Sequence, residues 1–293
     1  MTVIVSIDGV VVPAEGAVVS VFDRGFLYGD GVFEVLRTYG GEPFALDEHL
    51  ARLEASLARV HIRPPITRAA LAAEVRATLA AASHGESYLR IMITRGVAPL
   101  GLDLDRAKGS TRVILAAPLS LPPRATYADG ARAITCDASR PFADAKQLGY
   151  LPSIVLLHEA RARGASEALL VDAHANVLEG AASNVFVVQD GALVTPREGS
   201  ILAGITRANV LAAATALGLP VEVTDVPRAR LLDATEVFVT STIRELVPVV
   251  AIDDRPVGSG VPGPVTRALH RAFRARVADA LGAPAARATL PWE

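Results

Sequence analysis

The sequence predicts an α+β protein of two domains, a smaller N-terminal α/β domain and a larger, strand-rich C-terminal domain that forms a sheet or pseudo-barrel. Two observations carry this prediction. The chain has 293 residues, enough for two domains of ordinary size. The proline-containing segment LPPRATYADG separates a first half of mixed strands and helices from a second half in which strands predominate. We expect domains at 1–119 and 130–293, joined by a linker at 120–129.

Hydrophobic spacing distinguishes the elements of the N-terminal half. Two apolar stretches, 3–12 and 17–22, are typical of strands and flank the turn-forming segment PAEG. The first expected helix places leucines three or four residues apart on one face and offers Asp47 as its cap, and the second begins at Thr67. The ranges expected for these helices are 47–60 and 67–83, and further strands are expected at 88–94 and 111–119.

The C-terminal half combines short helices with more strands. We expect its first helix to begin at Ser153 and to end at Gly164. The dipeptide Asp190-Gly191 predicts a hairpin turn between two strands. The strands are expected at 167–172, 184–189, 192–196 and 236–242, and the remaining helices at 205–218 and 264–282.

Composition excludes several classes of protein. Half of the chain is apolar, the net charge is −2, and the basic residues are scattered, so no surface for nucleic acid or an anionic membrane is expected. The single cysteine, Cys136, leaves no disulfide framework and no cysteine-rich metal site, and we expect no metal. The N-terminus lacks a basic segment and no apolar run has the length of a membrane span. We therefore expect a cytoplasmic protein.

Lysine is nearly absent from this chain. Of 29 basic residues only Lys108 and Lys146 are lysines, and the others are arginines. A lysine amine can lose its proton when desolvated and attack a carbonyl, whereas a guanidinium stays charged. Lys146 is therefore a candidate nucleophile for a Schiff base, although arginine bias alone leaves a few lysines by chance, as Lys108 illustrates.

Three further features match what pyridoxal phosphate requires. Glu179 is either a solvated turn acid or a carboxylate that keeps a pyridine nitrogen protonated. Thr206 either caps the helix that Gly204 precedes or offers, with the free N–H groups of that helix start, a place for a phosphate. The strand at 236–242 ends in hydroxyl residues suited to another side of the same phosphate. An amine, a carboxylate and a phosphate cup together predict this cofactor.

Six motifs, in order, resemble one family: RGFLYGDGVFEVLR, EHLARL, AKQLGYLPS, VLEGAASNVF, LAGITR and VTSTIRELVPV. They are similar to those of the fold-type IV pyridoxal-phosphate enzymes, the class IV aminotransferases, and closest to branched-chain amino-acid aminotransferases. The resemblance extends from about residue 20 to about residue 250. It implies a homodimer whose domains hold the cofactor between them and whose pocket is completed by loops of the partner subunit.

The resemblance also implies a role for individual residues. It makes Lys146 the lysine of the internal aldimine and the later acid and base of a 1,3-proton shift. It places Glu179 at the pyridine nitrogen, Leu202 against the ring and Tyr150 at the phenolic oxygen. The implied phosphate ligands are Arg52, Ile205, Thr206 and Thr242. One departure is visible, because many relatives have Asn where this chain has Gly149.

Substrate choice depends on a few side chains. Alternation places Tyr88 and Arg90 on one strand face, and this Tyr-x-Arg pair resembles the branched-chain enzymes. The apolar loop Leu100-Gly101-Leu102 also fits that subfamily. The substrate-contacting residues that the resemblance implies are Phe33, Arg37, Tyr88, Arg90, Leu100 and Ile243. The expected reaction is transamination of a branched-chain L-amino acid with 2-oxoglutarate.

Other functions remain open at this point. The D-amino-acid enzymes carry an Arg-x-His pair in the loop that here reads TRGVAPLGLD and lacks histidine, but TRG and TSTIRE also resemble D-amino-acid and (R)-amine transaminases. Arg244 is either a carboxylate ligand of that kind or a solvated loop residue. A 4-amino-4-deoxychorismate lyase would need a less apolar loop. A non-catalytic cofactor-binding scaffold would need neither Lys146 nor Glu179.

Overall fold

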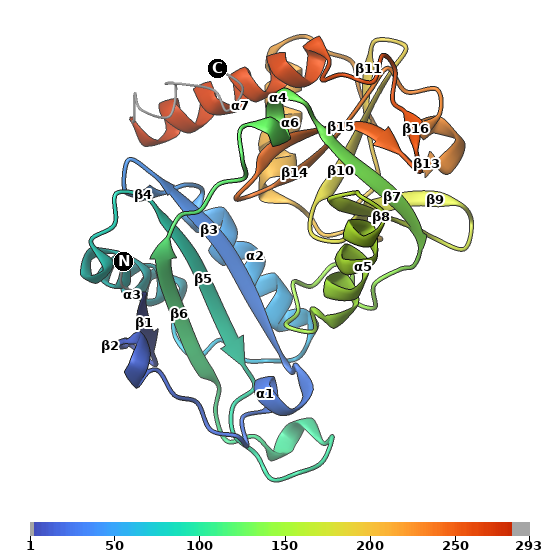
Figure 1. Cartoon of the computed structure of the whole chain (residues 1–293). Helices are drawn as coiled ribbons and strands as arrows, with labels where there is room; N and C mark the ends of the chain where they lie inside the picture. The colour runs from blue at the N-terminus through green and yellow to red at the C-terminus, as the bar shows by residue number, and fades with distance from the viewer. Residues whose placement is uncertain (1–2, 283–293) are drawn as a thin grey trace. The chain divides into compact units, whose positions relative to one another are not determined.

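The chain folds into two compact units, seen in a computed structural model that describes residues 3–282 (Figure 1). The first unit contains the chain up to residue 120 together with 145–150, and the second contains 121–144 and the chain from 151 onward. Lys146 thus belongs to unit 1, although the segments before residue 145 (121–144) and after residue 150 belong to unit 2. The α+β class predicted from the sequence is confirmed. The predicted domain and linker boundaries stay a prediction.

Unit 1 is built on an antiparallel sheet with the strand order β2-β1-β6-β5-β3-β4 over its described residues. Its strands are β1 (Ile4–Ile7), β2 (Val10–Pro13), β3 (Gly31–Tyr39), β4 (Glu42–Pro43), β5 (Ser87–Thr94) and β6 (Thr111–Pro118). Its helices are α1 (Arg24–Tyr28), α2 (Leu46–Arg59) and α3 (Arg68–Ala82). Short 3₁₀ turns occupy Ala14–Gly16 and Leu104–Arg106.

The core of unit 1 lies between one face of this sheet and the helices α2 and α3 (Figure 1). Leu89, Ile91 and Ile93 of β5 are buried against the helices, while the residues between them are half-buried on the opposite face. This strict alternation confirms the predicted strand and leaves Tyr88 and Arg90 on the face away from the core. Thr67 caps α3, as predicted, by accepting a hydrogen bond from the Ala70 N–H.

Three local predictions in the first half of the sequence were wrong. The β1–β2 hairpin turns at Asp8-Gly9, both with positive φ, and not at PAEG. No strand forms over 17–22, because the chain leaves the sheet after β2. Asp47 lies within the first turn of α2, whose N-cap is Ala45 in the left-handed region. A carboxylate in that turn still complements the helix dipole.

Unit 2 holds one large sheet with the path β12-β11-β10-β14-β15-β7-β8-β9-β13 and with β16 beside β15, within the described part of the chain. The strands are β7 (Ala131–Asp137), β8 (Glu167–Val171), β9 (Asn176–Gly180), β10 (Asn184–Gln189), β11 (Ala192–Thr195), β12 (Val221–Val223), β13 (Val226–Pro227), β14 (Glu236–Ser241), β15 (Glu245–Ile252) and β16 (Arg255–Pro256). The helices are α4 (Ala125–Ala128), α5 (Leu151–Ala162), α6 (Ile205–Ala216) and α7 (Pro264–Leu281), with a 3₁₀ turn at Arg228–Leu231.

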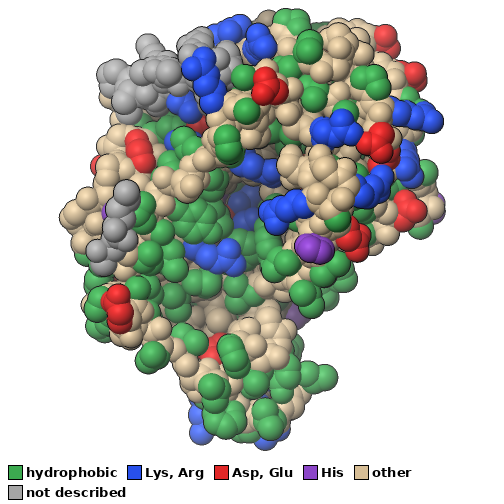
Figure 2. Space-filling model, in the orientation of Figure 1, with side chains coloured by type: hydrophobic (Ala, Val, Ile, Leu, Met, Phe, Trp, Pro, Cys, Tyr) green, Lys and Arg blue, Asp and Glu red, His purple; other side chains and the backbone are tan. Residues whose placement is uncertain are grey.

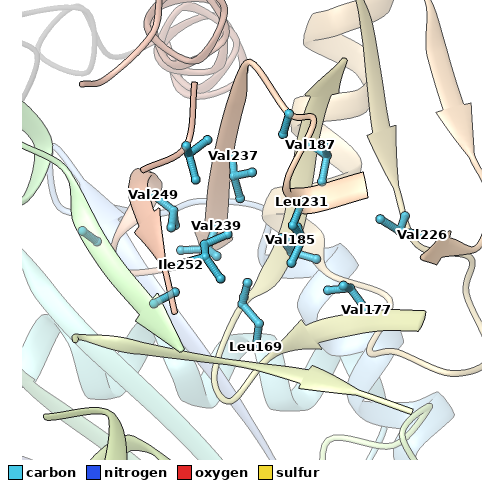
Figure 3. Packing of buried hydrophobic residues seen from close by; sticks show 14 of the residues in the cluster. Leu169, Val177, Val185, Val187, Val226, Leu231, Val237, Val239, Val249 and Ile252 are labelled. Atoms are coloured by element: carbon cyan, nitrogen blue, oxygen red, sulfur yellow. The ribbon is translucent and has the colours of Figure 1, made fainter. Parts of the chain in front are cut away.

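The sheet of unit 2 curls around its own core, so that valines from several strands meet inside it (Figure 3). Val177, Val185, Val239 and Val249 come from four different strands and are each at most 2% exposed. Branched side chains of this kind pack well on pleated surfaces. The strand-rich second unit and the Asp190-Gly191 hairpin are as the sequence predicted. Ser153, the expected cap of α5, lies inside the helix, which begins at Leu151.

Among residues 3–282, no helix combines the length and the apolar composition that crossing a bilayer requires.

Candidate active site

The segment around Lys146 runs along the free edge of β3 in unit 1. The backbone N–H of Phe33 donates to the Lys146 carbonyl at 2.8 Å, and the Leu148 N–H donates to the Gly31 carbonyl at 3.0 Å. The Lys146 N–H itself donates to the buried Ser56 hydroxyl of α2 at 3.1 Å. Backbone pairing on one side and a helix hydroxyl on the other therefore fix the position of the lysine.

A glycine makes this close approach possible. A Cβ at Gly31 would lie 2.7 Å from both the Ile93 carbonyl oxygen and the Leu148 Cδ1, which is closer than real Cβ atoms come. Gly31 therefore lets the lysine segment pack directly against β3. This close packing explains why the second glycine of the GDGVFEVLR motif, Gly31, stands at that position.

Phe33 is the centre of a cluster that contains Lys146. The Lys146 Nζ lies 4.6 Å from the centroid of the Phe33 ring, and the Arg90 guanidinium carbon lies 4.0 Å from it. The Tyr150 ring meets Phe33 edge to face, with 5.3 Å between centroids. Phe33 is 1% exposed. The structure thus brings three of the sequence-predicted residues, Lys146, Arg90 and Tyr150, around the buried ring of a fourth, Phe33.

The remaining predicted residues of this sheet share the same face. Arg37 pairs with Tyr88 across β3 and β5, and Val35 pairs with Arg90, so their side chains project from one side of the sheet. The Arg37 guanidinium is buried and lies 4.1 Å from the Tyr39 ring. Two arginines and a tyrosine therefore line a face next to Lys146, a distribution suited to an anionic substrate.

Arg52 is held from behind by a buried carboxylate. Its Nε and Nη2 donate to the two oxygens of Glu34, each at 2.7 Å, and His49 Nδ1 lies 2.8 Å from Glu34 Oε2. Glu34 is fully buried and the Arg52 side chain is 10% exposed. Arg52 is thus not a solvated surface residue. This bidentate pairing fixes the guanidinium plane.

Electrostatics keep this group in one charge state at neutral pH. Burial favours the neutral form of Glu34, but the Arg52 charge and hydrogen bonds from Arg52 and His49 outweigh it and lower the Glu34 pKa to about 2. Burial lowers the pKa of His49 below its ordinary 6.5, and the Glu34 carboxylate offsets this only in part. His49 is therefore neutral, and its Nδ1 carries the proton that it donates to Glu34.

Neutral His49 makes stability depend on pH. The unfolded chain protonates this histidine near pH 6.5 and the folded chain resists, so the unfolded state binds more protons as the pH falls below 6.5. The contribution of His49 is complete above that pH and is lost below it. His49→Asn keeps an N–H donor without the titration. We expect thermal denaturation between pH 7.5 and 5 to show a smaller loss of stability for this variant than for the native chain.

The matched control is His158→Asn, because His158 is exposed on α5. This variant should follow the pH dependence of the native chain. Equal pH dependence in the His49→Asn variant and the native chain would contradict the assigned neutral state of His49.

In unit 2, Glu179 is a buried and oriented carboxylate on β9. It is 4% exposed, and its Oε1 accepts from Nε and Nη2 of Arg140 at 2.9 and 2.5 Å. Its Oε2 accepts from the Leu202 N–H at 3.1 Å. The Arg140 charge stabilises the ionised carboxylate. Glu179 is therefore not a solvated turn acid, and the backbone of Leu202 lies beside it.

The N-terminus of α6 has backbone N–H groups that can bind an anion. Gly204 is its N-cap, and no side chain caps its first N–H groups, which include those of Ile205 and Thr206. A Cβ at Gly204 would lie 1.9 Å from Asn184 Oδ1, so a glycine is needed there. Thr206 is the second residue of the helix and not its cap, as the alternative interpretation had it.

The buried hydroxyl of Thr240 lies on the same side of the sheet as Asn184, which contacts the start of α6. Asn184 and Thr240 are directly paired across β10 and β14, so their side chains lie on the same side of the sheet, and the Asn184 amide donates to the Leu202 carbonyl at 2.9 Å. The Thr240 Oγ1 is buried and has no hydrogen-bond partner among the described residues. A buried polar atom without a partner is costly unless a ligand satisfies it. These donors in unit 2 fit the phosphate of pyridoxal phosphate.

The turn between β14 and β15 contains Thr242, Ile243 and Arg244, all half-buried. Arg244 donates through Nη2 to the fully buried Glu167 at 2.7 Å and through Nε to the Ser241 hydroxyl at 3.2 Å. Arg244 is therefore not the solvated loop residue that one interpretation allowed. Its guanidinium already has a carboxylate partner inside unit 2.

The following residue anchors this turn to the C-terminal helix. Glu245 has a φ of +57°, which is unfavourable for a residue with a side chain, and it is 1% exposed. Its Oε2 lies 2.6 Å from His270 Nε2 and accepts from Arg274 Nε at 2.7 Å. Contacts with two residues of α7 thus offset the backbone strain and set the position of the turn.

One predicted substrate residue, Leu100, lies in a loop that is hydrogen-bonded to α1. The Leu100 side chain is 63% exposed, and its loop is tied to α1 by bonds from Arg24 Nη1 to the Gly101 carbonyl and from the Gly101 N–H to the Tyr28 hydroxyl. These contacts join the loop to α1 and not to the Phe33 cluster. The role of Leu100 stays a prediction.

Sequence reasoning missed the partners of the predicted residues, namely Glu34, His49, Ser56, Arg140 and Asn184. Two of them left a signal. Glu34 is a charged residue inside the apolar strand GVFEVLR. His49 is one helical turn before Arg52, so the side chains of His49 and Arg52 face the same strand. Arg140 and Asn184 left none, because their contacts arise from folding of distant segments.

Comparisons with known proteins identify the family that this chain resembles. Residues 31–252 match the model of the family "Amino-transferase class IV". A protein of Methanocaldococcus jannaschii, whose name marks it as a candidate branched-chain-amino-acid aminotransferase, is 38% identical, covering 92% of this chain and 94% of that one. A D-alanine aminotransferase of Bacillus licheniformis is 36% identical, covering 87% and 90% of the two chains.

A solved structure is similar over the same extent. The branched-chain amino acid aminotransferase of T.th., solved in complex with N-(5'-phosphopyridoxyl)-L-glutamate, shares 32% identity with a TM-score of 0.87. The match covers 94% of each chain. That complex holds a derivative of the cofactor that the sequence motifs and the donors of unit 2 indicate.

Proposed function

The chain belongs to the class IV aminotransferase family, and we propose that it transfers the amino group of a branched-chain L-amino acid to 2-oxoglutarate. The observation that carries the choice of substrate is the cluster of Phe33, Arg90 and Lys146 on the sheet of unit 1. An arginine that packs on the same ring as the reactive amine would attract the carboxylate of an amino acid. The aromatic ring beside both gives an aliphatic side chain an apolar surface to contact.

We propose pyridoxal 5'-phosphate as the cofactor. In unit 2 its phosphate would be held by the N–H groups of Ile205 and Thr206 and by the hydroxyl of Thr242, and its ring nitrogen by Glu179. Arg52 of unit 1 would be a further phosphate ligand, oriented in advance by Glu34. When bound, this cofactor supplies a carbonyl for condensation with amines and a protonated ring that accepts electrons from the substrate.

The residues of the chain divide the work of the reaction. Lys146 would hold the carbonyl group of the cofactor through Nζ and, as a free amine, would carry the proton of the substrate α-carbon. Glu179, whose ionised form the Arg140 charge stabilises, would hold a proton on the ring nitrogen. Tyr150 would donate a hydrogen bond to the phenolic oxygen, and Leu202 would pack against the ring. Arg37, Tyr88 and Arg90 orient the substrate carboxylate, and Ile243 lies in the turn beside Thr242.

A D-amino-acid aminotransferase is the second candidate. The identity of 36% to a D-alanine aminotransferase favours it, as do the TRG and TSTIRE segments. Against it stands the carboxylate partner of Arg244, because Glu167 already engages the guanidinium that would bind such a substrate. An (R)-amine transaminase has less support, because its amine substrate has no carboxylate for the Arg37, Tyr88 and Arg90 face. A 4-amino-4-deoxychorismate lyase has less support because the Leu100-Gly101-Leu102 loop is apolar. A non-catalytic scaffold leaves Lys146 and Glu179 without a role.

We also propose a cytoplasmic homodimer. Apolar side chains gather over α1 and the neighbouring loop of unit 1 (Figure 2), and several of them are large and exposed. They are Phe22, Phe26, Tyr28, Val97, Leu100, Leu102 and Leu104. An apolar surface of this kind is typical of a subunit interface. The partner's loops would then complete the pocket, which gives Leu100 a role that its own unit does not.

The dimer has a direct test. Light scattering coupled to gel filtration should give twice the 30.6 kDa of one chain. Leu102→Glu, which places a charge in the apolar surface, should lower this mass toward that of one chain, whereas Val223→Glu, on an exposed strand of unit 2, should not. A native protein of single-chain mass would contradict the dimer.

The reaction is tested by one half of the transfer. The protein loaded with pyridoxal phosphate is mixed with single amino donors, and the absorbance of the lysine-bound cofactor is followed. We expect rapid loss with L-leucine, L-isoleucine and L-valine and slow loss with D-alanine and (R)-1-phenylethylamine. Preferential loss with D-alanine would replace the first candidate with the second. No loss with any donor would favour the scaffold.

A further inference from the structure

Unit 2 contains a cleft of about 410 Å³ that none of the proposed cofactor or substrate residues lines. It lies between the 3₁₀ turn Arg228–Leu231 and the β15–β16 hairpin, beside Thr135 of β7. All of its lining residues belong to unit 2. Its volume lies within the range of about 300–1,000 Å³ that is usual for small-molecule sites.

The floor of the cleft is apolar and buried. Leu231, Ile252 and Val257 line it, and each is at most 7% exposed. All three also belong to the main hydrophobic core of unit 2, two of them visible in Figure 3. A ligand in the cleft would therefore rest directly on the wall of the core. An aliphatic group of a few carbons suits this floor.

The rim of the cleft carries excess positive charge. The single carboxylate in the lining, Asp253, accepts from the Thr135 N–H at 2.9 Å, from the Thr135 hydroxyl at 2.5 Å and from Arg228 Nη2 at 3.1 Å. These hydrogen bonds outweigh burial and lower the Asp253 pKa, so it is ionised at neutral pH. One carboxylate thus faces two lining arginines, Arg228 and Arg255.

Arg255 is the arginine that is available to a ligand. It is exposed on β16, and the described residues give its guanidinium no hydrogen bond and no ion pair. Arg228 is half-exposed, and its Nη2 lies 3.1 Å from Asp253 Oδ2 while its Nη1 lies 3.9 Å from Asp137 Oδ1. A guanidinium offers five donors in a fixed fork that matches a carboxylate. The cleft therefore combines an anion-binding rim with an aliphatic floor.

We propose that this cleft is a second ligand site, which binds a small aliphatic carboxylate with its anionic group on Arg255 and Arg228 and its chain on the apolar floor. The site is distinct from the residues assigned to amino transfer, and it does not depend on the proposed reaction. Amino acids and 2-oxo acids with branched aliphatic side chains belong to the class of ligand that it fits.

The probe is 4-methylvalerate, which has no amino or keto group and cannot be turned over. Equilibrium dialysis of the cofactor-loaded protein measures how many molecules bind per chain. We expect Arg255→Glu to bind one molecule fewer than the native protein, because the reversed charge repels the carboxylate. Arg271→Glu makes the same charge change at an exposed residue of α7 away from the cleft, and should bind the native number. The difference between variants measures this site alone, whatever the substrate site does.

Two comparisons make the test decisive. Acetate and the uncharged 4-methylpentanamide should each compete at least about tenfold more weakly than 4-methylvalerate, because each lacks one of the two contacts. Equal binding by the Arg255→Glu protein and the native protein would overturn the proposal. So would acetate competing as well as 4-methylvalerate, since the rim alone would then bind the anion. Arg255 is exposed, so its replacement leaves folding intact.

Discussion

Replacing Lys146 with arginine abolishes amino transfer, although the positive charge stays in place. A guanidinium keeps its proton at any physiological pH, so it can neither bind the cofactor carbonyl nor carry the α-proton. Lys146→Ala has the same result. We expect turnover to fall by at least about 10²–10⁴-fold, the usual contribution of a general acid–base group, and the absorbance of the lysine-bound cofactor to disappear. Stopped-flow spectroscopy and a product assay measure the two effects.

A control and a rescue accompany this prediction. Lys108→Ala, which removes the other lysine, should leave the spectrum and the turnover unchanged. Methylamine added to the Lys146→Ala protein should restore part of the proton transfer, because a free amine can take the place of the lost one. A native spectrum in the Lys146→Arg protein would show that another group holds the cofactor.

Glu179→Gln should slow turnover by about 10²–10³-fold while the cofactor stays bound, because a neutral amide does not stabilise a proton on the ring nitrogen. The buried ion pair with Arg140 is lost as well, so the thermal stability of the protein falls. Both kcat and the denaturation temperature are therefore measured. Only the loss of kcat is specific to the proposed role.

Arg140→Gln provides the matched comparison. It removes the same ion pair but leaves the carboxylate and its bond from the Leu202 N–H, so we expect a similar loss of stability and a smaller loss of turnover. If Glu179→Gln lost stability but kept near-native turnover, the carboxylate would be structural and the role at the ring nitrogen would be wrong.

The sequence predicts elements well where one local pattern suffices. The alternation in β5 sets which of its residues are buried, and this holds because a strand has a period of two. The leucine stripe of α2 and the Thr67 cap of α3 are equally local. Lys146 was predicted from its chemistry alone, because forming a Schiff base is one of the few roles of a lysine that an arginine cannot fill.

Prediction failed where distant parts of the chain decide. The β1–β2 turn lies at Asp8-Gly9 and not at PAEG, because the pairing of β1 with β6 sets the length of β1. Glu34 and Arg52 are separated in sequence and meet only when α2 packs on β3. The bond from Arg140 to Glu179 joins the loop after β7 to strand β9, two segments that no local pattern relates. The candidate site was thus predicted as a set of chemical groups but not as a network.

Gly149 shows the limit of the family resemblance. Its φ is not positive, and a Cβ there would meet only Gln147 Oε1, at 3.9 Å. Neither the backbone nor the available space requires glycine at this position. Nothing in the described residues explains why this chain departs from the Asn of many relatives.

The most direct test of amino transfer by Lys146 follows the nitrogen atom itself. The cofactor-loaded protein is given ¹⁵N-labelled L-leucine and unlabelled 2-oxoglutarate, and NMR detects the label. We predict ¹⁵N-labelled glutamate and unlabelled 4-methyl-2-oxopentanoate in equal amounts. The native and Lys108→Ala proteins should form both products, and the Lys146→Arg protein should form neither. Absence of labelled glutamate from L-leucine, with transfer from D-alanine under the same conditions, would contradict the proposed function.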